Sequence, residues 1–431
     1  MNHLPSQRSL WAAGQAIGEL MSLPLANPQL ISLAAGFVDQ QSLPVDETLR
    51  ALESLLNEPE GARAALQYGT TSGHPPLREF ILERQLQQDG MVAERQGFDI
   101  ERVVCTAGSN QLLQLVGECL FDPGDIVLCA APTYLVILGT FRNLGIRTIG
   151  VETDTEGIVP EALDDTLRRL CQAGEISRVK AIYVVSYFDN PRGLTLSAER
   201  RQKVVELAKQ WSLEIPSEDC LKSQIVVIDD VAYRELRYQG EDVPSMLRFD
   251  EEQDTVVVAG TFSKPFSPGI RVGWGILPRA LIEPVTNIKA NVDFGSPNFN
   301  QHLMAKILEL DLFDPHVERL RSLYRSKLDT MLAALAESLS KMQGTSWKRP
   351  DGGLYVWLQL ADLIDTGPSG NLLSRAMDEG VFYVPGEYCF ASEGQPTQKN
   401  TMRLSFGVQD HDDIRSGIRA LAQSMNDIYE V

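Results

Sequence analysis

The chain contains little of what marks membrane or nucleic-acid-binding proteins. Its 431 residues include no apolar stretch of about 18 residues, so no membrane-spanning helix is expected. Only 39 basic residues stand against 58 acidic ones, a net charge of −19. This charge argues against a partner such as nucleic acid or an anionic membrane, because both need positive patches. It remains compatible with a small anionic ligand, which a few local Arg or Lys side chains can hold.

Histidine and cysteine are scarce as well. The five histidines lie far apart and form no HExxH or comparable ligand spacing, so the sequence predicts no metal site. The six cysteines are scattered without a CxxC pair, and the N-terminus has neither a basic start nor an unbroken apolar run. We therefore expect no signal peptide, reduced thiols and a cytoplasmic protein.

Short runs rich in Val and Ile alternate with helical patterns over residues 50–310. Such runs, apolar on both faces, are typical of parallel strands covered by helices, so the order of elements predicts an open α/β sheet. The expected strands are Val103–Thr106, Ile126–Ala130, Thr148–Val151, Val179–Val185, Ile225–Asp229, Thr255–Ala259 and Val272–Leu277. Ser197 is expected to cap the helix after the fourth strand.

The pattern changes after Phe294. Residues 302–342 are mostly helical with one break at Asp314–Pro315, and short strands and helices then alternate to the end, which predicts a smaller α+β unit. The acidic stretch Leu213–Gln224, ahead of the fifth strand, suggests no role.

Polar residues follow the first strand, at the sheet edge where ligands of open parallel sheets bind. Gly108, Ser109 and Asn110 open directly into a helix, and the free backbone N–H groups at such a helix start can hold a phosphate. Taken alone, this pattern is more typical of an ordinary helix cap.

The fourth and fifth strands also end in polar residues. Asn190–Gly193, an Asn-Pro-Arg-Gly segment, would by itself be a plain turn. Asp229 and Asp230 precede Tyr233, and two adjacent buried acids would repel each other, so at least one is expected to face a positive partner or solvent. A surface carboxylate is the simpler explanation for an isolated Asp.

A lysine follows the sixth strand. Lys264 comes just past a buried strand, where desolvation lowers the pKa of an amine and makes it nucleophilic. Arg271 opens the next apolar segment. Taken alone, Lys264 could be a helix-capping residue and Arg271 a surface residue. Chance is a poor explanation, however, for the clustering of all these groups at strand ends of one sheet. Together they match the phosphate, aldehyde, ring nitrogen and 3-oxygen of pyridoxal phosphate.

These residues form four motifs in a specific order and spacing: Asn190-Pro-x-Gly, Asp230-x-x-Tyr233, Ser263-Lys264 and Arg271. With them the sequence resembles the fold type I pyridoxal-phosphate enzymes, specifically the class I and II aminotransferases, and most of all the branch of 2-aminoadipate and kynurenine aminotransferases. The resemblance runs from about Ile31 to Leu421. It implies a large cofactor-binding domain over residues 46–310 with a mainly parallel seven-stranded sheet. Residues 1–45 and 311–431 would form the smaller α+β domain, with the N-terminal segment over the active site.

The resemblance also implies roles for single residues. Lys264 resembles the lysine that forms a Schiff base with the cofactor and then moves the proton, and Asp230 resembles the partner of the ring nitrogen. Asn190 and Tyr233 resemble the donors to the 3-oxygen, and Tyr134 the aromatic residue stacked on the ring. The expected phosphate-binding set is Ser109, Asn110, Thr261, Ser263 and Arg271.

Three further matches lie outside the central sheet. Tyr68 resembles the tyrosine that reaches the phosphate of the neighbouring subunit, which implies a homodimer with shared sites. Arg403 resembles the arginine that binds the substrate α-carboxylate, where a planar guanidinium pairs bidentately, together with Asn190. Gly36 resembles the glycine where the N-terminal segment crosses the substrate site.

The implied activity is a ping-pong transfer of an amino group from an L-amino acid to a 2-oxo acid. No Lys or Arg occurs between Arg8 and Arg50, which favours a neutral, aliphatic or aromatic donor over an acidic one.

A β-lyase, decarboxylase or cyclising enzyme of the same fold shares most of these motifs and stays an alternative. An aminotransferase-like regulatory domain is disfavoured, because such regulators place a DNA-binding domain first and here Ile31 already begins the enzyme-like part. The intact set of Lys264, Asp230 and Arg271 argues against an interaction protein without cofactor.

Overall fold

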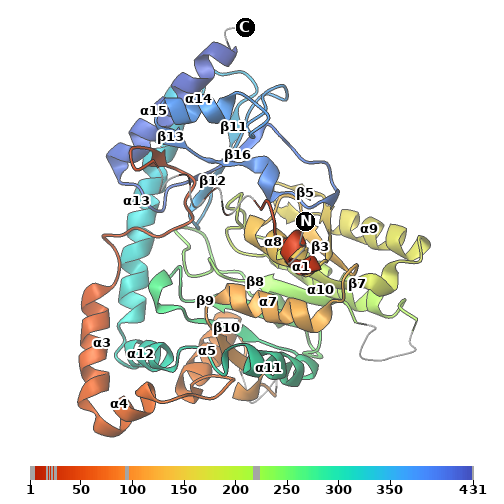
Figure 1. Ribbon diagram of the computed structural model, residues 1–431, viewed down its shortest axis with the longest axis vertical. Helices are drawn as coiled ribbons and strands as arrows, with labels where there is room; N and C mark the ends of the chain where they lie inside the picture. The colour runs from red at the N-terminus through yellow and green to blue at the C-terminus, as the bar shows by residue number, and fades with distance from the viewer. Residues whose placement is uncertain are drawn as a thin grey trace.

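A single large sheet organises the computed structural model, which describes residues 5–15, 18, 20, 23, 27–92, 97–216 and 224–429. This sheet has eight strands in the order β15-β4-β3-β7-β8-β9-β10-β2 (Figure 1). Its strands are β2 (Val103–Thr106), β3 (Ile126–Ala130), β4 (Arg147–Val151), β7 (Val179–Val185), β8 (Val226–Asp230), β9 (Val256–Thr261), β10 (Gly273–Ile276) and β15 (Glu393–Gly394). The Val- and Ile-rich central strands are buried on both faces, as their composition predicts.

The direction of the strands decides where side chains gather. Neighbours from β4 to β9 are parallel, and β10 runs antiparallel to both β9 and β2. The strands that finish at one common edge end at Thr106, Ala130, Val151, Val185, Asp230 and Thr261. Because β10 is reversed, it begins at this same edge, directly after Arg271. The topology thus brings the end of every predicted motif strand to one place.

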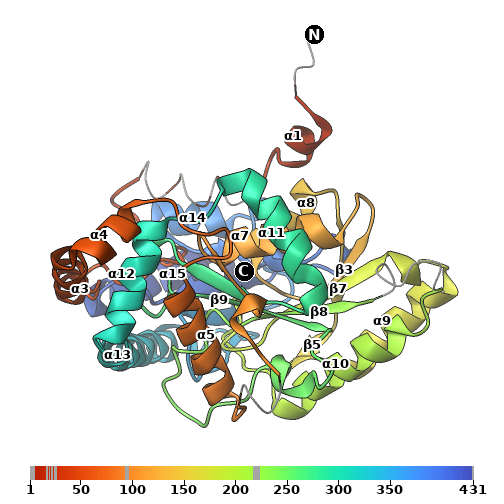
Figure 2. The ribbon, with the colours of Figure 1, turned by 90° about the horizontal axis from the view of Figure 1, so that it is seen from below.

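Helices cover both faces of the large sheet. Figure 2 shows α7, α8 and α11 on one side of the sheet and α9 and α10 on the other. The helices around this sheet are α5 (Pro75–Gln88), α7 (Ser109–Leu120), α8 (Leu135–Asn143), α9 (Pro160–Gln172), α10 (Ala198–Ser212), α11 (Arg279–Asp293) and α12 (Asn298–Glu309). Ser197 caps α10 as predicted, since its side chain accepts a hydrogen bond from the Arg200 N–H.

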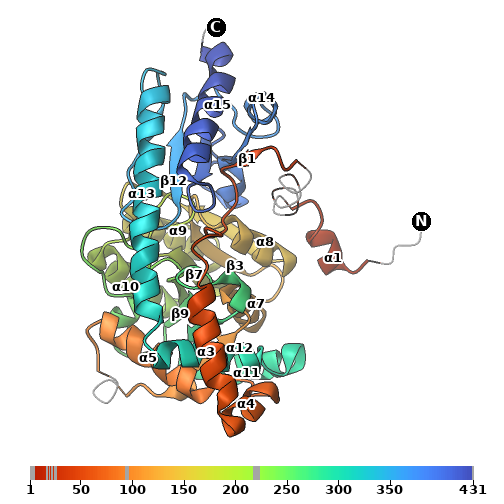
Figure 3. The same ribbon diagram turned by 90° about the vertical axis from the view of Figure 1, so that its left-hand side faces the viewer.

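A second, four-stranded sheet lies beyond the carboxyl edge of the first. Its order is β11-β12-β16-β14, and β1 pairs in parallel with β13 beside it. The strands are β1 (Ile31–Ser32), β11 (Ser346–Trp347), β12 (Tyr355–Gln359), β13 (Val381–Phe382), β14 (Val384–Pro385) and β16 (Thr401–Ser405), and β5 (Thr153–Asp154) with β6 (Gly157–Ile158) forms a separate hairpin. Helices α14 (Leu372–Asp378) and α15 (His411–Tyr429) belong to this unit, and α13 (Phe313–Leu339) runs alongside both sheets (Figures 1 and 3).

The N-terminal part of the chain contributes elements to both units. Helices α3 (Val45–Asn57) and α4 (Pro59–Leu66) lie at the far end of the large unit, whereas β1 belongs to the small one and α1 (Gln7–Trp11) packs near α8. The segment between β1 and α3 therefore passes the edge where the motif strands end.

The seven predicted strands are all present, with ends shifted by at most two residues. The eighth strand, β15, comes from the C-terminal part and pairs with the exposed edge of β4, a two-residue contact that leaves no periodic signal in the sequence. The helical break predicted at Asp314–Pro315 is wrong by a few residues. It falls between α12 and α13, and Pro315 sits in the first turn of α13, where proline loses no helical hydrogen bond.

The acidic stretch Leu213–Gln224 is described only in part, because residues 217–223 lie outside the described ranges. Within the described part of the chain, no helix is long and apolar enough to cross a membrane.

Candidate active site

The carboxyl edge of the large sheet borders a cavity of about 400 Å³. The segment after β1, the start of α8 and strands of the small sheet close it from the other side. Twelve of the thirteen predicted site residues line it: Gly36, Ser109, Asn110, Tyr134, Asn190, Asp230, Tyr233, Thr261, Ser263, Lys264, Arg271 and Arg403. Tyr68 is the exception.

The amine of Lys264 points into this cavity. Its Nζ donates a 2.7 Å hydrogen bond to the Gly36 carbonyl and lies 6.0 Å from the centre of the Tyr233 ring. Burial lowers the pKa of Lys264, and the nearby guanidinium groups of Arg403 and Arg271 lower it further, while Tyr355 and Asp230 act in the opposite direction. The net effect shifts this amine toward its neutral, nucleophilic form.

The two adjacent acids at the end of β8 face opposite sides of the sheet. Asp229 pairs in register with Val184 and Asp230 with Val185, so their side chains alternate. Asp230 lines the cavity, and burial raises its pKa to about 6. Asp229 is fully buried on the other face, where it accepts hydrogen bonds from the Ser186 hydroxyl and the Met246 N–H. The two carboxylates thus have different surroundings, although the charge of Asp229 still contributes to the raised pKa of Asp230.

The start of α7 forms a cradle with Arg271. Gly108 has φ +86°, which glycine adopts without strain, and within the described part of the chain no side chain caps the helix after it. The Arg271 guanidinium donates to the Ala107 carbonyl at 2.7 Å, and a Cβ on Gly108 would approach its Nη2 to 2.6 Å. The uncapped N–H groups and a cation thus share one small space, a combination that suits an anion.

Two hydroxyls complete this cradle. Thr261 ends β9, and its Oγ1 lies 3.0 Å from the hydroxyl of Ser263 and accepts a hydrogen bond from the Ser263 N–H. This local turn holds both side chains at the cavity, next to Lys264.

Arg403 brings a second guanidinium into the cavity from β16. It donates to Asn190 Oδ1 at 2.9 Å and to the Ala34 carbonyl at 2.5 Å, and it lies 4.3 Å from the centre of the Tyr355 ring. Its Nε is buried and has no hydrogen-bond partner among the described residues. A buried donor of this kind needs an acceptor, and a carboxylate supplies one.

Tyr355 connects several of these groups, and no motif pointed to it. Its hydroxyl lies 3.1 Å from the hydroxyl of Tyr233, and a Cβ on Gly36 would approach that oxygen to 2.7 Å. The N-terminal segment can therefore cross the cavity at this point only because residue 36 has no side chain. This contact is the physical reason for a glycine at that position.

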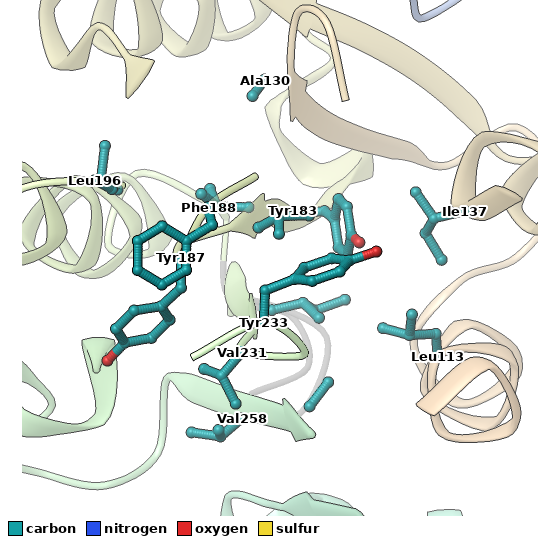
Figure 4. Packing of buried hydrophobic residues seen from close by; sticks show 14 of the residues in the cluster. Leu113, Ala130, Ile137, Tyr183, Tyr187, Phe188, Leu196, Val231, Tyr233 and Val258 are labelled. Atoms are coloured by element: carbon teal, nitrogen blue, oxygen red, sulfur yellow. The ribbon is translucent and has the colours of Figure 1, made fainter. Parts of the chain in front are cut away.

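Tyr183 is a second residue that no motif marks. It is fully buried on β7, and its hydroxyl donates to Asp230 Oδ2 at 2.8 Å. Figure 4 shows Tyr183 and Tyr233 within the buried cluster that also contains Leu113 and Ile137. As a tyrosine in an apolar strand, it carries no sequence signal beyond the strand itself.

Tyr134 lies at the cavity between the two units. It hydrogen-bonds the side chain of Asn110, and the preceding Thr133 N–H donates to the Cys389 carbonyl at 2.7 Å. Contacts from both units thus fix the ring that the resemblance places against a cofactor.

Tyr68 lies away from this cavity. Its side chain is 84% exposed and packs on Phe294, itself 73% exposed, with ring centres 5.9 Å apart. A tyrosine so exposed does not contribute to the site of its own chain.

The remaining wall of the cavity is apolar. It is formed by Leu20, Phe37, Leu135, Val136 and Val384, among others. Of the described residues that line the cavity, only Lys264, Arg271 and Arg403 are cationic.

Comparison with known proteins identifies the family of this chain. The family model of class I and II aminotransferases matches residues 28–421. The aromatic-amino-acid aminotransferase 1 of Thermococcus litoralis is 34% identical over 98% of this chain and 94% of its own length. The kynurenine aminotransferase structure of Pyrococcus horikoshii superposes with a TM-score of 0.87 at 33% identity, covering 99% of this chain and 98% of that one.

A further solved structure carries a cofactor derivative. The α-aminoadipate aminotransferase of Thermus thermophilus, in complex with N-(5′-phosphopyridoxyl)-L-leucine, has a TM-score of 0.82 at 30% identity and covers 98% of this chain and 97% of that one. With the matched residues spanning the cavity and both sheets, the chain belongs to the class I and II aminotransferases, in the branch of the aromatic, 2-aminoadipate and kynurenine enzymes.

Proposed function

We propose that the cavity binds pyridoxal 5′-phosphate and that the enzyme transfers the amino group of a neutral L-amino acid to a 2-oxo acid. The observation that carries this proposal is the position of Lys264. Its half-buried amine, with a lowered pKa, shares one cavity with the Asp230 carboxylate, the Arg271 cradle and the Arg403 guanidinium.

The residues fit the cofactor group by group. The uncapped start of α7, Arg271 and the two hydroxyls of Thr261 and Ser263 suit a phosphate. Asp230 suits a protonated ring nitrogen, since burial makes an unpaired carboxylate costly there. When bound, pyridoxal phosphate supplies an aldehyde for amines and a ring that accepts an electron pair.

The side chains then divide the work. With the cofactor bound, Lys264 would act as the general base that removes the proton from the Cα of the donor. Arg403 holds the α-carboxylate through its guanidinium, with Asn190 beside it. Tyr233 and Asn190 would donate hydrogen bonds to the 3-oxygen of the cofactor, and Tyr134 would lie against its ring.

The apolar wall supports a donor with an aliphatic or aromatic side chain. Each of the three described cations at the cavity already has a role, so none is left for a side-chain carboxylate. The wall residues Leu20, Phe37 and Val136 offer apolar contact instead. Donors such as leucine or phenylalanine would bury their side chains here.

We also propose a homodimer in which Tyr68 completes the site of the partner. Two further exposed apolar side chains, Leu66 and Val292, each stand two positions before a member of the exposed Tyr68–Phe294 pair. An exposed group of this kind is a feature of protein interfaces. Residues 46–310 would then form the large domain, and residues 1–45 and 311–431 the small one.

The donor proposal is tested by single-turnover rates with each amino acid added alone to the holoenzyme. We expect the ratio of the single-turnover rate constant to the dissociation constant to be higher for leucine, methionine, phenylalanine or tyrosine than for aspartate, glutamate or 2-aminoadipate. The donor assignment is wrong if an acidic donor is far the best. Release of ammonia or carbon dioxide in place of a stoichiometric 2-oxo acid would instead favour another reaction of the same fold.

A further inference from the structure

The register of the large sheet places Tyr183 beside Asp230. Tyr183 on β7 pairs with Ile228 and Val185 pairs with Asp230, so the two side chains lie on the same face, two positions apart. The Tyr183 hydroxyl reaches across and donates to Asp230 Oδ2 at 2.8 Å.

The ring of Tyr183 has no freedom to turn away. Its exposed fraction is 0%, and it packs edge-on against Phe141 of α8 at 6.2 Å between ring centres. Burial and the neighbouring Asp230 raise the pKa of Tyr183, so the phenol keeps its proton and stays a donor at neutral pH.

Asp230 is held at both oxygens. Oδ1 accepts a hydrogen bond from the Ala232 N–H at 3.1 Å, and Oδ2 accepts the one from Tyr183. Burial raises the pKa of Asp230 and so favours the protonated acid. The hydrogen bond from Tyr183 lowers this pKa more than any other neighbouring group does. A protonated acid cannot pair with a ring cation.

We propose that Tyr183 is a positioning residue, whose hydroxyl keeps Asp230 ionised and in one orientation toward the ring nitrogen of the cofactor. The inference rests on the proposed function. Tyr183 is not among the residues that line the cavity, so it acts through Asp230 and not on the cofactor itself.

The test replaces Tyr183→Phe and uses Tyr187→Phe as the matched control. Tyr187 is similarly buried and lies just past the end of β7, but its hydroxyl donates to the Val243 carbonyl at 2.6 Å. Two quantities are measured: the dissociation constant of pyridoxal phosphate for the apoprotein, and the pH midpoint of the visible absorbance of the bound cofactor.

Tyr183→Phe is expected to weaken cofactor binding about tenfold, the loss of one hydrogen bond to a charged group. The pH midpoint of the absorbance reports the loss of a proton from the linkage between the lysine and the cofactor. This midpoint should rise, because a ring nitrogen that is protonated less firmly withdraws less electron density from the linkage, which then keeps its proton to higher pH. Tyr187→Phe should leave both quantities within about twofold of wild type, even where it lowers the melting temperature.

Two further arms separate positioning from general stability. In an Asp230→Asn background, Tyr183→Phe should cost no additional cofactor affinity, since its partner charge is already gone. Replacing Tyr183 by 3-fluorotyrosine, a stronger donor of nearly the same size, should move the pH midpoint downward.

The inference is overturned if Tyr183→Phe keeps the wild-type affinity and midpoint, or if Tyr187→Phe changes them equally. An undiminished effect in the Asp230→Asn background, or an unmoved midpoint with 3-fluorotyrosine, also overturns it. Failure of the wild-type apoprotein to bind pyridoxal phosphate would contradict the proposed function itself.

Discussion

The Nζ of Lys264 donates a hydrogen bond to the carbonyl of Gly36, 228 positions earlier in the chain. One partner follows a strand of the large sheet, and the other lies on the segment that connects β1 to α3. The site is therefore completed only when the N-terminal segment has folded against the large unit, and several of its properties depend on that segment.

Gly36→Ala tests the crossing of the N-terminal segment. The added Cβ would lie 2.7 Å from the Tyr355 hydroxyl, so the segment must shift away from Lys264. We expect kcat/KM to fall about tenfold, within the range for overpacking. Adding Tyr355→Phe removes the obstructing oxygen and should recover most of the loss relative to Tyr355→Phe alone. Additive losses in the double variant would show that the contact with Tyr355 is not the cause.

Arg403→Lys and Arg271→Lys test the division between the two guanidinium sites. Both variants keep a positive charge but lose the planar fork. Arg403→Lys should lower kcat/KM for the amino donor about 30-fold and leave cofactor affinity nearly unchanged. Arg271→Lys should weaken cofactor binding about tenfold. The KM for the donor should stay unchanged when it is measured with the enzyme saturated with cofactor. The assignment fails if the two variants show the same pattern, measured by donor kinetics and cofactor titration.

Asp230 should make the stability of the apoprotein depend on pH. Burial raises its pKa from 3.8 to about 6, so the folded apoprotein binds an extra proton between these values and loses stability as the pH rises through them. Asp230→Asn removes this loss. Its free energy of unfolding should exceed that of wild type by at most about 3 kcal/mol above pH 6, and the difference should shrink toward pH 4.

Chemical denaturation of both apoproteins across this pH range measures the difference. Asp165→Asn, on the exposed face of α9 beside Arg168, serves as the control for the loss of one carboxylate away from the cavity. A constant difference between wild type and Asp230→Asn at all pH values would contradict the predicted titration of Asp230.

Hybrid dimers test whether Tyr68 serves the neighbouring site. In a dimer with one Lys264→Ala chain and one Tyr68→Ala chain, shared sites leave one site with both residues intact and one with neither. The purified hybrid should therefore show about half the wild-type activity at limiting cofactor, far above either parent. If Tyr68 acted on its own chain, the hybrid would show only the mean of the parents. A monomeric protein in solution would also contradict the proposal.

The large sheet and most of the site could be predicted from the sequence because both depend on local patterns. Val- and Ile-rich runs mark the strands, and the residues just beyond them have to meet at one edge once the strands are parallel. These patterns are enough to identify Lys264, Asp230 and Arg271 as candidates. Arg403 and Gly36 lie far from that edge in sequence, and only the family resemblance points to them.

Tyr183 and Tyr355 escape prediction because their roles depend on register and on packing between the units. A tyrosine in an apolar strand has the pattern of an ordinary core residue, and only the pairing of β7 with β8 places Tyr183 against Asp230. Tyr355 acquires its contacts from the N-terminal segment and from Arg403 on β16, which no local pattern records. The edge strand β15 is missed for the same reason.

Lys264 is proposed to hold pyridoxal phosphate covalently and to release it when the amine of a donor takes the place of the lysine. The most direct test is the visible absorption spectrum of the purified protein before and after an L-amino acid is added alone. We expect a yellow wild-type protein that loses this colour as one equivalent of 2-oxo acid forms per site. A protein that stays colourless with added pyridoxal phosphate, or a Lys264→Ala variant whose cofactor is still covalently linked to the chain, would contradict the claim.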